Sequence, residues 1–301
     1  MSLACARAAA EALCLPLYQY IGGLSGRVMP VPMMNVVNGG KHAGNNIDIQ
    51  EFMIMPTGAR TFTEGYRWCA EVYQSLKKLL EQAGMSVSVG DEGGFAPDLK
   101  DDMEACELIC RAIEQAGFKT GKHFVLALDA AASEWQAQDG YRLPKRGQDM
   151  TRAELIDYWK KLCSTYPIQS LEDPLGQDDF EGFAQITAAL PHVQIVGDDL
   201  FVTNPARIAR GGNGTATTVL IKPNQIGTLS LTLKAVDEAR RRGMNVIVSH
   251  RSGETGDALQ IKAGAPCRSE RTEKYNRLTQ IAYELGAAAE YGGVFDHLQN
   301  K

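Results

Sequence analysis

Three acidic residues and one lysine each follow a short apolar run. Asp129 ends "FVLALD", Glu172 lies in "IQSLED", and Asp198 lies in "VQIVGDD". Lys222 follows the next run, in "TVLIKP". Three carboxylates without His or Cys form a hard-oxygen site that suits magnesium, with water and substrate oxygens completing the octahedron. Acids at strand ends can also face solvent or cap a helix, but three in succession before a lysine favour a metal site.

Lys222 has a possible catalytic role of its own. A lysine within an apolar run is rarely fully buried unless it is paired. Neighbouring carboxylates would pair it, and a nearby divalent cation would lower its pKa towards the range of a general base. The alternative is a lysine at a strand tip whose ammonium group reaches solvent.

A second set of polar residues lies upstream. Glu92 is part of "VGDEGGF", where the following glycines allow a tight loop to carry the acid into a cleft. Taken alone, the same segment also fits a solvated acidic turn. His42 lies in the short loop "KHAGNNIDI", and Glu51 follows it. A single histidine is usually structural, so the role of His42 depends on its neighbours.

Helix and strand patterns alternate from residue 61 onwards. Apolar residues recur at helix spacing over 61–84, 102–116, from 151 and over 228–243, and Thr61 with Glu64 forms a capping-box pattern. Between the helices lie apolar runs at 124–129, 168–173, 193–199, 218–223, 245–250 and 260–265. Their continuous hydrophobicity indicates strands that are covered on both faces, as in a parallel sheet.

The ends of these runs distinguish an open sheet from a barrel. Each run ends in or near a polar residue: Asp129, Glu172, Asp198, Lys222, His250 and Lys262. An open sheet collects a ligand at one switch point, whereas a barrel brings all its strand ends into one ring. We therefore predict an α/β fold, a (β/α)8 TIM-type barrel. The upstream runs "VPMMNVVNGG" and "QEFMIMP" are joined too closely for a crossover helix, so the second strand should be antiparallel.

Composition excludes several classes of protein. The 301 residues include 31 basic and 36 acidic ones, for a net charge of −5, which argues against nucleic acid as a partner. Seven scattered cysteines without a CxxC spacing are typical of reduced cytosolic thiols. No secretion signal is recognisable, and no apolar stretch approaches the roughly 18 to 20 residues that span a membrane. We expect a cytoplasmic protein without a membrane partner, folded as a single domain over 1–301.

Several long segments together resemble enolase (phosphopyruvate hydratase). They are "VPMMNVVNGGKHAGNNIDIQEFMI", "VGDEGGFAP", "SLEDP", "DDLFVTNP", "LIKPNQIGTL", "SHRSGET" and "QIKAGAPCRSERTEKYNRL". The resemblance covers nearly the whole chain. It implies the magnesium-dependent, reversible dehydration of 2-phosphoglycerate to phosphoenolpyruvate in glycolysis. The implied partner is a small phosphorylated substrate, and a homo-oligomer is possible.

The resemblance also implies roles for individual residues. Asp129, Glu172 and Asp198 would hold the magnesium ion, and Lys222 would remove the proton next to the substrate carboxylate. Lys262, with the metal, would stabilise the charge of the intermediate. A lysine or histidine base with one or two magnesium ions is general for the enolase superfamily.

The remaining implied roles concern the hydroxyl and the phosphate. Glu92 would act on the leaving hydroxyl group, assisted by Glu51, with Gln50 nearby. Arg251 and Ser252 would bind the phosphate, because a planar guanidinium matches two phosphate oxygens at once. The same pocket would be lined by His42 and His250.

The chain departs from the enolase pattern in two places. Enolases carry an N-terminal domain with a mobile loop that helps to close the site, and residues 1–25 are expected to be a remnant of the segment that leads from it. Enolases also place a helix between "SHRSGET" and "QIK", where this chain has only "GDAL". Residues 253–259 could span about 23 Å when extended, against about 17 Å for a five-residue strand, so the chain can return without a helix. The helix ring is then incomplete, and the exposed apolar groove should destabilise the fold or attract another chain.

Three functions are compatible with these patterns. The first is an enolase-type lyase with reduced activity, and the second is a catalytically inactive enolase-like protein with a binding or structural role. The third is a superfamily dehydratase that acts on sugar acids, which the phosphate-binding residues argue against. The intact catalytic positions favour the first and the two departures favour the second.

Overall fold

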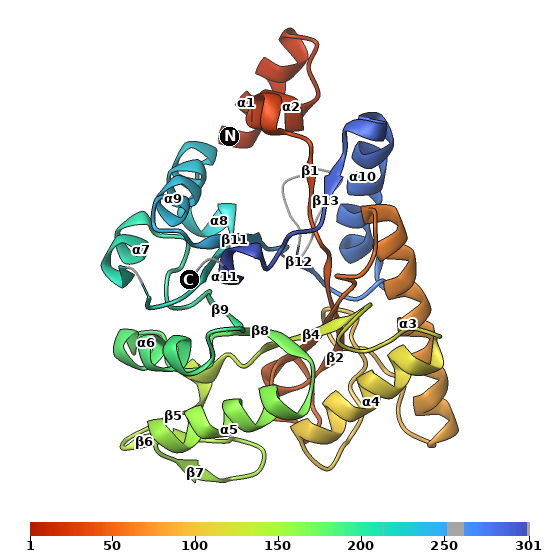
Figure 1. The fold of residues 1–301 in the computed structure, drawn as a ribbon, viewed down its shortest axis with the longest axis vertical. Helices are drawn as coiled ribbons and strands as arrows, with labels where there is room; N and C mark the ends of the chain where they lie inside the picture. The colour runs from red at the N-terminus through yellow and green to blue at the C-terminus, as the bar shows by residue number, and fades with distance from the viewer. Residues whose placement is uncertain (213, 252–261, 300–301) are drawn as a thin grey trace.

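A computed structural model describes residues 1–212, 214–251 and 262–299, and shows a curled sheet with helices around its outside (Figure 1). Eight strands pair in the order β11-β10-β9-β8-β4-β3-β2-β12. Their bounds are β2 Met33–Asn38, β3 Glu51–Met55, β4 Val125–Asp129, β8 Ile168–Glu172, β9 Gln194–Gly197, β10 Thr218–Ile221, β11 Asn245–Val248 and β12 Lys262–Ala263. The predicted TIM-type α/β barrel is confirmed.

One strand runs against the others. β3 pairs antiparallel with both β2 and β4, whereas the remaining neighbours in this sheet are parallel. This confirms the antiparallel second strand. The register places Glu51 opposite Asp129, and Asp129 opposite Glu172. Three acids therefore lie side by side at one end of the sheet.

Helices cover the outer face of the strands (Figure 1). They are α3 Phe62–Gln82, α4 Asp102–Gln115, α5 Arg152–Thr165, α6 Phe180–Ala189, α7 Pro205–Gly211, α9 Leu229–Arg241 and α10 Ser269–Leu285. Side chains of Thr61, Thr151 and Thr228 cap the helices that follow them, and Thr151 with Glu154 completes a capping box. The four predicted helices α3, α4, α5 and α9 are confirmed. The sequence patterns did not predict α6, α7, α10 or the small sheet formed by β5 Gln136–Ala137, β6 Gly140–Arg142 and β7 Asp149–Met150.

Alternate residues of the strands enter two separate apolar layers. Val125 and Ala127 belong to the layer that fills the barrel, with Met53, Val196 and Leu220. Side chains on the other face of the strands, such as Leu126 and Leu128, pack in the larger layer between the strands and the helices. A strand that is apolar on both faces produces this arrangement, as the sequence indicated.

The helix ring is incomplete between β11 and β12. Within the described ranges, no helix lies between these two strands and no strand pairing joins them. The expected extended return over 253–259 lies outside the described residues. The other parallel strands are linked by segments that contain at least one helix. Within the described ranges, the two ends of the strand order are therefore β11 and β12.

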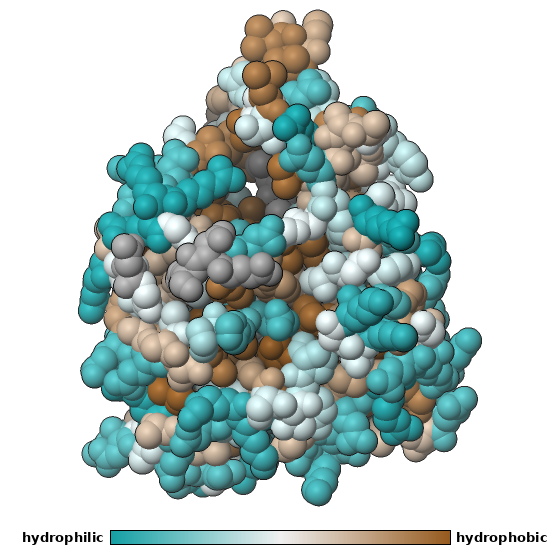
Figure 2. All heavy atoms as spheres, in the orientation of Figure 1, coloured by the Kyte–Doolittle hydropathy of each residue, from teal (hydrophilic) through white to brown (hydrophobic). Residues whose placement is uncertain are grey.

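Both ends of the chain add small elements to the barrel. α1 Ser2–Ala12 and α2 Leu17–Gly22 project from the ring, and apolar residues gather on their tip (Figures 1 and 2). At the other end, β13 Glu290–Tyr291 pairs with β1 Val28–Met29, and Val294 and Phe295 pack against the inner apolar layer. In the part of the chain that the structure describes, no helix is sufficiently long and apolar to cross a bilayer.

A buried ionic network anchors the loop before β3. Asp102, at the start of α4, accepts hydrogen bonds from the backbone N–H groups of Asp48 and Ile49 at 3.1 and 3.2 Å. Arg146 donates to Asp48 at 2.7 Å and also contacts Asp102. Tyr158 donates to Asp102 Oδ2 at 2.7 Å, and burial, then the Asp102 charge, raises the pKa of its hydroxyl. The phenol thus remains a donor, and the loop leading to Gln50 and Glu51 is held in place.

We predict that Tyr158→Phe destabilises the fold by about 2 kcal/mol, because it removes a donor from a buried carboxylate. Chemical denaturation followed by circular dichroism would measure the change in the free energy of unfolding. Tyr283→Phe is the matched control, since this side chain is 74% exposed. Equal stabilities for the two variants would show that the network does not contribute to the fold.

Candidate active site

A cavity of about 290 Å³ opens at the carboxyl ends of the strands. Nine residues predicted for the site line it: His42, Gln50, Glu51, Glu92, Asp129, Asp198, Lys222, His250 and Arg251. Ser252 lies outside the described residues, and so does the side chain of Lys262 in β12. Glu172 ends β8 and is buried, and the described lining contains its neighbour Asp173 instead.

The alternation of side chains along the strands explains why these residues reach one cavity. On β4, Val125 and Ala127 fill the barrel, and Asp129 continues the same face. Glu51 lies two positions from Met53, and Lys222 lies two positions from Leu220, so each continues the face of its strand that points into the barrel. Because side chains alternate with a period of two, the last inward position of each strand brings its polar group to the mouth of the barrel.

One group of acids gathers beyond β8 and β9. Ligand atoms of Asp173, Asp198 and Asp199 lie within 4.8 Å of one another. Burial raises the pKa of Asp173 well above its ordinary value, and the charges of Asp198 and Asp199 add to the effect. Burial and the Asp198 charge also raise the pKa of Asp199. This negative potential would be relieved by a cation.

Asp198 has the features of a metal ligand. Its Oδ2 contacts the amine of Lys222, while its buried Oδ1 has no hydrogen-bond partner in the described part of the chain. A buried carboxylate oxygen without a partner is costly. A divalent cation would satisfy it, and hard oxygen donors are those that magnesium and calcium prefer. The residues present therefore fit a bound metal ion.

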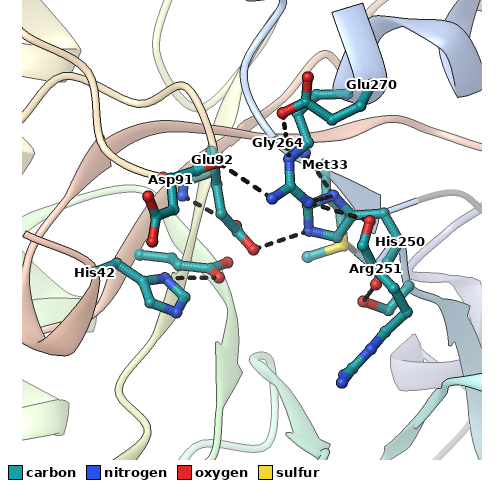
Figure 3. Close-up of polar contacts among 12 residues, drawn as sticks. Met33, His42, Asp91, Glu92, His250, Arg251, Gly264 and Glu270 are labelled. Atoms are coloured by element: carbon teal, nitrogen blue, oxygen red, sulfur yellow. Dashed lines mark hydrogen bonds and ion pairs between the residues drawn. The ribbon is translucent and has the colours of Figure 1, made fainter. Parts of the chain in front are cut away.

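His42, Glu51 and Glu92 form a second group, with ligand atoms also within 4.8 Å of one another. His42 Nδ1 lies 3.7 Å from Glu51 Oε1, and Asn35 donates to Glu92 Oε2 at 3.3 Å. Figure 3 shows His42 on one side of this part of the cavity and Glu92 turned towards His250. Two groups of acids thus share one cavity, and Lys222 contacts Asp198 of the first group.

His250 connects Glu92 to the segment that follows β12. Its Nδ1 accepts a hydrogen bond from the backbone N–H of Gly264 at 3.1 Å and lies 2.9 Å from Arg271 Nη1. Its Nε2 lies 3.1 Å from Glu92 Oε1 (Figure 3). Because Nδ1 faces two donors, the ring nitrogen that carries hydrogen is Nε2. The imidazole therefore donates to Glu92 and orients its carboxylate.

The backbone of the Glu92 loop is held as closely as its side chain. Ala265 donates its N–H to the Glu92 carbonyl at 2.8 Å, and Tyr73 donates to the Gly93 carbonyl at 2.6 Å. A Cβ on Gly264 would lie 2.1 Å from the Glu92 carbonyl oxygen. Glycine is required there because the two backbones touch.

Sequence reasoning missed several residues of this site. Asp173 and Asp199 directly follow predicted ligands, so "ED" and "DD" were available signals. Asp173 has a φ of 41°, in the left-handed region. Neither of its neighbours in the sequence is of a type that predicts this conformation. Arg271 is 4% exposed and lies against His250, but it comes from α10, which the sequence patterns did not predict.

The charges of the cavity indicate what it can bind. Six carboxyl groups line it, from Glu51, Glu92, Asp129, Asp173, Asp198 and Asp199. The described cationic side chains in the lining are Lys222 and Arg251. An anionic substrate would be repelled unless further positive charge were added. The cavity thus combines two groups of carboxylates with one amine and one guanidinium group.

We predict that Gly264→Ala destabilises the protein by about 1–3 kcal/mol, because the new methyl group must push the Glu92 carbonyl away. Gly22→Ala is the matched control, since nothing lies within 4 Å of its Cβ position and its φ is −90°. Urea denaturation would compare the two variants. Unchanged stability in Gly264→Ala would contradict the close contact between the two backbones.

Comparison with known protein families matches most of the chain. Residues 26–299 match the family described as "Enolase, C-terminal TIM barrel domain". The matched range includes the whole curled sheet and every residue of the cavity. The family supports a lyase of the enolase superfamily, a small-molecule substrate and the use of a divalent metal ion. The chain belongs to the enolase C-terminal TIM barrel family.

Proposed function

We propose that this chain catalyses the magnesium-dependent, reversible dehydration of 2-phosphoglycerate to phosphoenolpyruvate. The observation that carries the proposal is that Lys222, which contacts Asp198 of one acid group, and Glu92, a member of the other, line the same cavity. A β-elimination needs a base at one carbon and an acid at the departing hydroxyl. The two groups meet this requirement within one site.

The substrate would be held by its two anionic ends. Arg251 is exposed at the cavity and would bind the phosphate, with Ser252 as a further donor. His42 and Gln50 would contact the middle of the molecule. The carboxylate would lie towards Asp129, Glu172 and Asp198, the proposed metal ligands. When bound, magnesium would neutralise the substrate carboxylate and stabilise the charge that develops on it.

The chain's own residues would move the protons. Lys222 Nζ would take the proton from C2 of the substrate, and the electron pair would pass to the carboxylate. Lys262 would stabilise that charge. Glu92, oriented by His250 and assisted by Glu51, would then protonate the C3 hydroxyl, which leaves as water as the double bond forms. The reverse reaction uses the same groups in the opposite order.

A second candidate is an inactive enolase-like protein that binds ligands without converting them. The observation in its favour is the lack of strand pairing between β11 and β12 within the described ranges. Small displacements of catalytic groups can cost about a hundredfold in rate. Such a protein would bind magnesium and phosphoenolpyruvate but would not exchange the C2 hydrogen of 2-phosphoglycerate.

We predict that Glu172→Gln and Asp198→Asn each weaken magnesium binding at least about tenfold, because each removes a hard anionic ligand. Isothermal titration of the protein with magnesium chloride would measure the dissociation constants. Glu181→Gln is the control, since that side chain is 75% exposed on α6. A large loss in Asp199→Asn combined with normal binding in Glu172→Gln would place the ion in the Asp173, Asp198 and Asp199 group instead.

We also predict that Lys222→Ala abolishes exchange of the substrate's C2 hydrogen with solvent, whereas Glu92→Gln retains this exchange and loses dehydration. The reason is that the two residues serve different bonds, and each contributes about 10²–10⁴-fold to its step. Proton NMR of 2-phosphoglycerate in D2O measures the exchange, and absorbance of phosphoenolpyruvate measures turnover. Lys161→Ala on the surface of α5 is the control. The opposite pattern would mean that the acid and the base are interchanged.

A further inference from the structure

Two consecutive β-branched residues near the site have a strained backbone. Val202 has a φ of 42° and Thr203 a φ of 57°. Both lie in the loop that follows β9 at the carboxyl end of the barrel. β-branched residues rarely adopt left-handed conformations, and such strain persists only where the surroundings hold it. The proposed reaction assigns no role to either residue.

The Thr203 hydroxyl makes one hydrogen bond with Lys222 and one with Gln225. Thr203 is fully buried, and its hydroxyl oxygen accepts a hydrogen bond from the Lys222 backbone N–H at 2.9 Å. The same hydroxyl donates to Gln225 Oε1 at 2.9 Å. Lys222 is the N-cap of the short helix α8 Pro223–Ile226. The Thr203 hydroxyl therefore fixes the backbone where β10 ends and the Lys222 side chain begins.

The other end of the same loop is fixed by Asp173. Its two carboxylate oxygens accept hydrogen bonds from the backbone N–H groups of Asp198 at 3.1 Å and Asp199 at 2.8 Å. Val202 donates its own N–H to the Asp198 carbonyl at 2.7 Å. One short loop thus holds Asp198 at its start and, through Thr203 near its end, the backbone of Lys222 after β10. Asp198 and Lys222 are the two residues whose side chains form an ion pair in the cavity.

We propose that Thr203 is a positioning residue for Lys222. Its hydroxyl holds the Lys222 backbone so that the amine stays beside Asp198 and faces the cavity. The strained conformation is what brings the hydroxyl of Thr203 to the Lys222 N–H. The catalytic consequence rests on the proposed function, in which Lys222 is the base. Thr203 itself lies outside the lining of the cavity.

Three variants separate the hydroxyl from the shape of the side chain. Thr203→Val keeps the β-branch and the volume, so the strain stays while the hydroxyl is lost. Thr203→Ser restores the hydroxyl. Thr217→Val is the matched control, because Thr217 is buried and accepts the Ile195 N–H at 2.8 Å. It precedes the same strand, β10, at the end away from the cavity.

The full chain with magnesium and 2-phosphoglycerate would be assayed for C2 hydrogen exchange, and Lys222 amide hydrogen exchange would be followed by NMR. We expect Thr203→Val to lower the maximal C2 exchange rate about 10- to 100-fold with KM nearly unchanged, as a small displacement of a catalytic group does. Thr203→Ser should recover most of that rate, and Thr217→Val should match the unchanged chain. The Lys222 amide should exchange at least about tenfold faster in Thr203→Val, because its acceptor is gone.

Two results would overturn the proposal. One is C2 exchange in Thr203→Val as fast as in Thr217→Val, and the other is unchanged protection of the Lys222 amide. If the unchanged chain does not exchange the C2 hydrogen, the proposed reaction is wrong, and amide protection alone then decides the role of Thr203. If Thr203→Val does not fold, Gln225→Met removes the acceptor of the Thr203 hydroxyl from an exposed residue. That variant should shift both measurements in the same direction by a few-fold, and no shift would overturn the proposal.

Discussion

The structure depends most on the interactions of one imidazole ring. Strand pairing does not join β11 to β12 in the described ranges, but His250 after β11 accepts the Gly264 N–H after β12. The same ring donates to Glu92 through Nε2. A protonated ring would present an N–H to two donors, Gly264 and Arg271, so the bridge requires the neutral ring. The hydrogen bond between the segments that follow β11 and β12 and the contact with Glu92 therefore both use the neutral ring.

The acids of the cavity oppose folding, and the surrounding backbone shows how they are kept together. Buried carboxylates repel one another and lose hydration. Left-handed conformations at Ala131, Asp173, Val202 and Thr203 all occur in loops that follow β4, β8 and β9. Each such residue costs of order 1–3 kcal/mol. Strain and charge repulsion are concentrated at the mouth of the barrel, while the apolar layers on both faces of the strands stabilise the fold.

The sequence predicted the barrel and much of its site for a clear physical reason. Continuous apolar runs identify strands that are covered on both faces. Because side chains alternate with a period of two, Asp129 and Lys222 lie on the face that points into the barrel. The same reasoning selected Glu172 and did not find Asp173, which follows the strand in a left-handed conformation and lines the cavity. It also could not find Arg271, whose contact with His250 joins residues 21 positions apart. Local patterns give the strands and their ends, whereas contacts between distant loops depend on the assembled fold.

Two carboxylates in this structure hold loops in place through hydrogen bonds to the backbone. Asp102 accepts the N–H groups of Asp48 and Ile49, and Asp173 accepts those of Asp198 and Asp199. A carboxylate that accepts two backbone N–H groups fixes a loop, and its oxygens are then less available to a ligand. Asp198 differs, since its Oδ1 accepts no hydrogen bond in the described part of the chain. The hydrogen-bond partners of each acid, more than its distance from the cavity, therefore distinguish Asp198, which has an oxygen without a partner in the described residues, from Asp173, whose oxygens hold the loop.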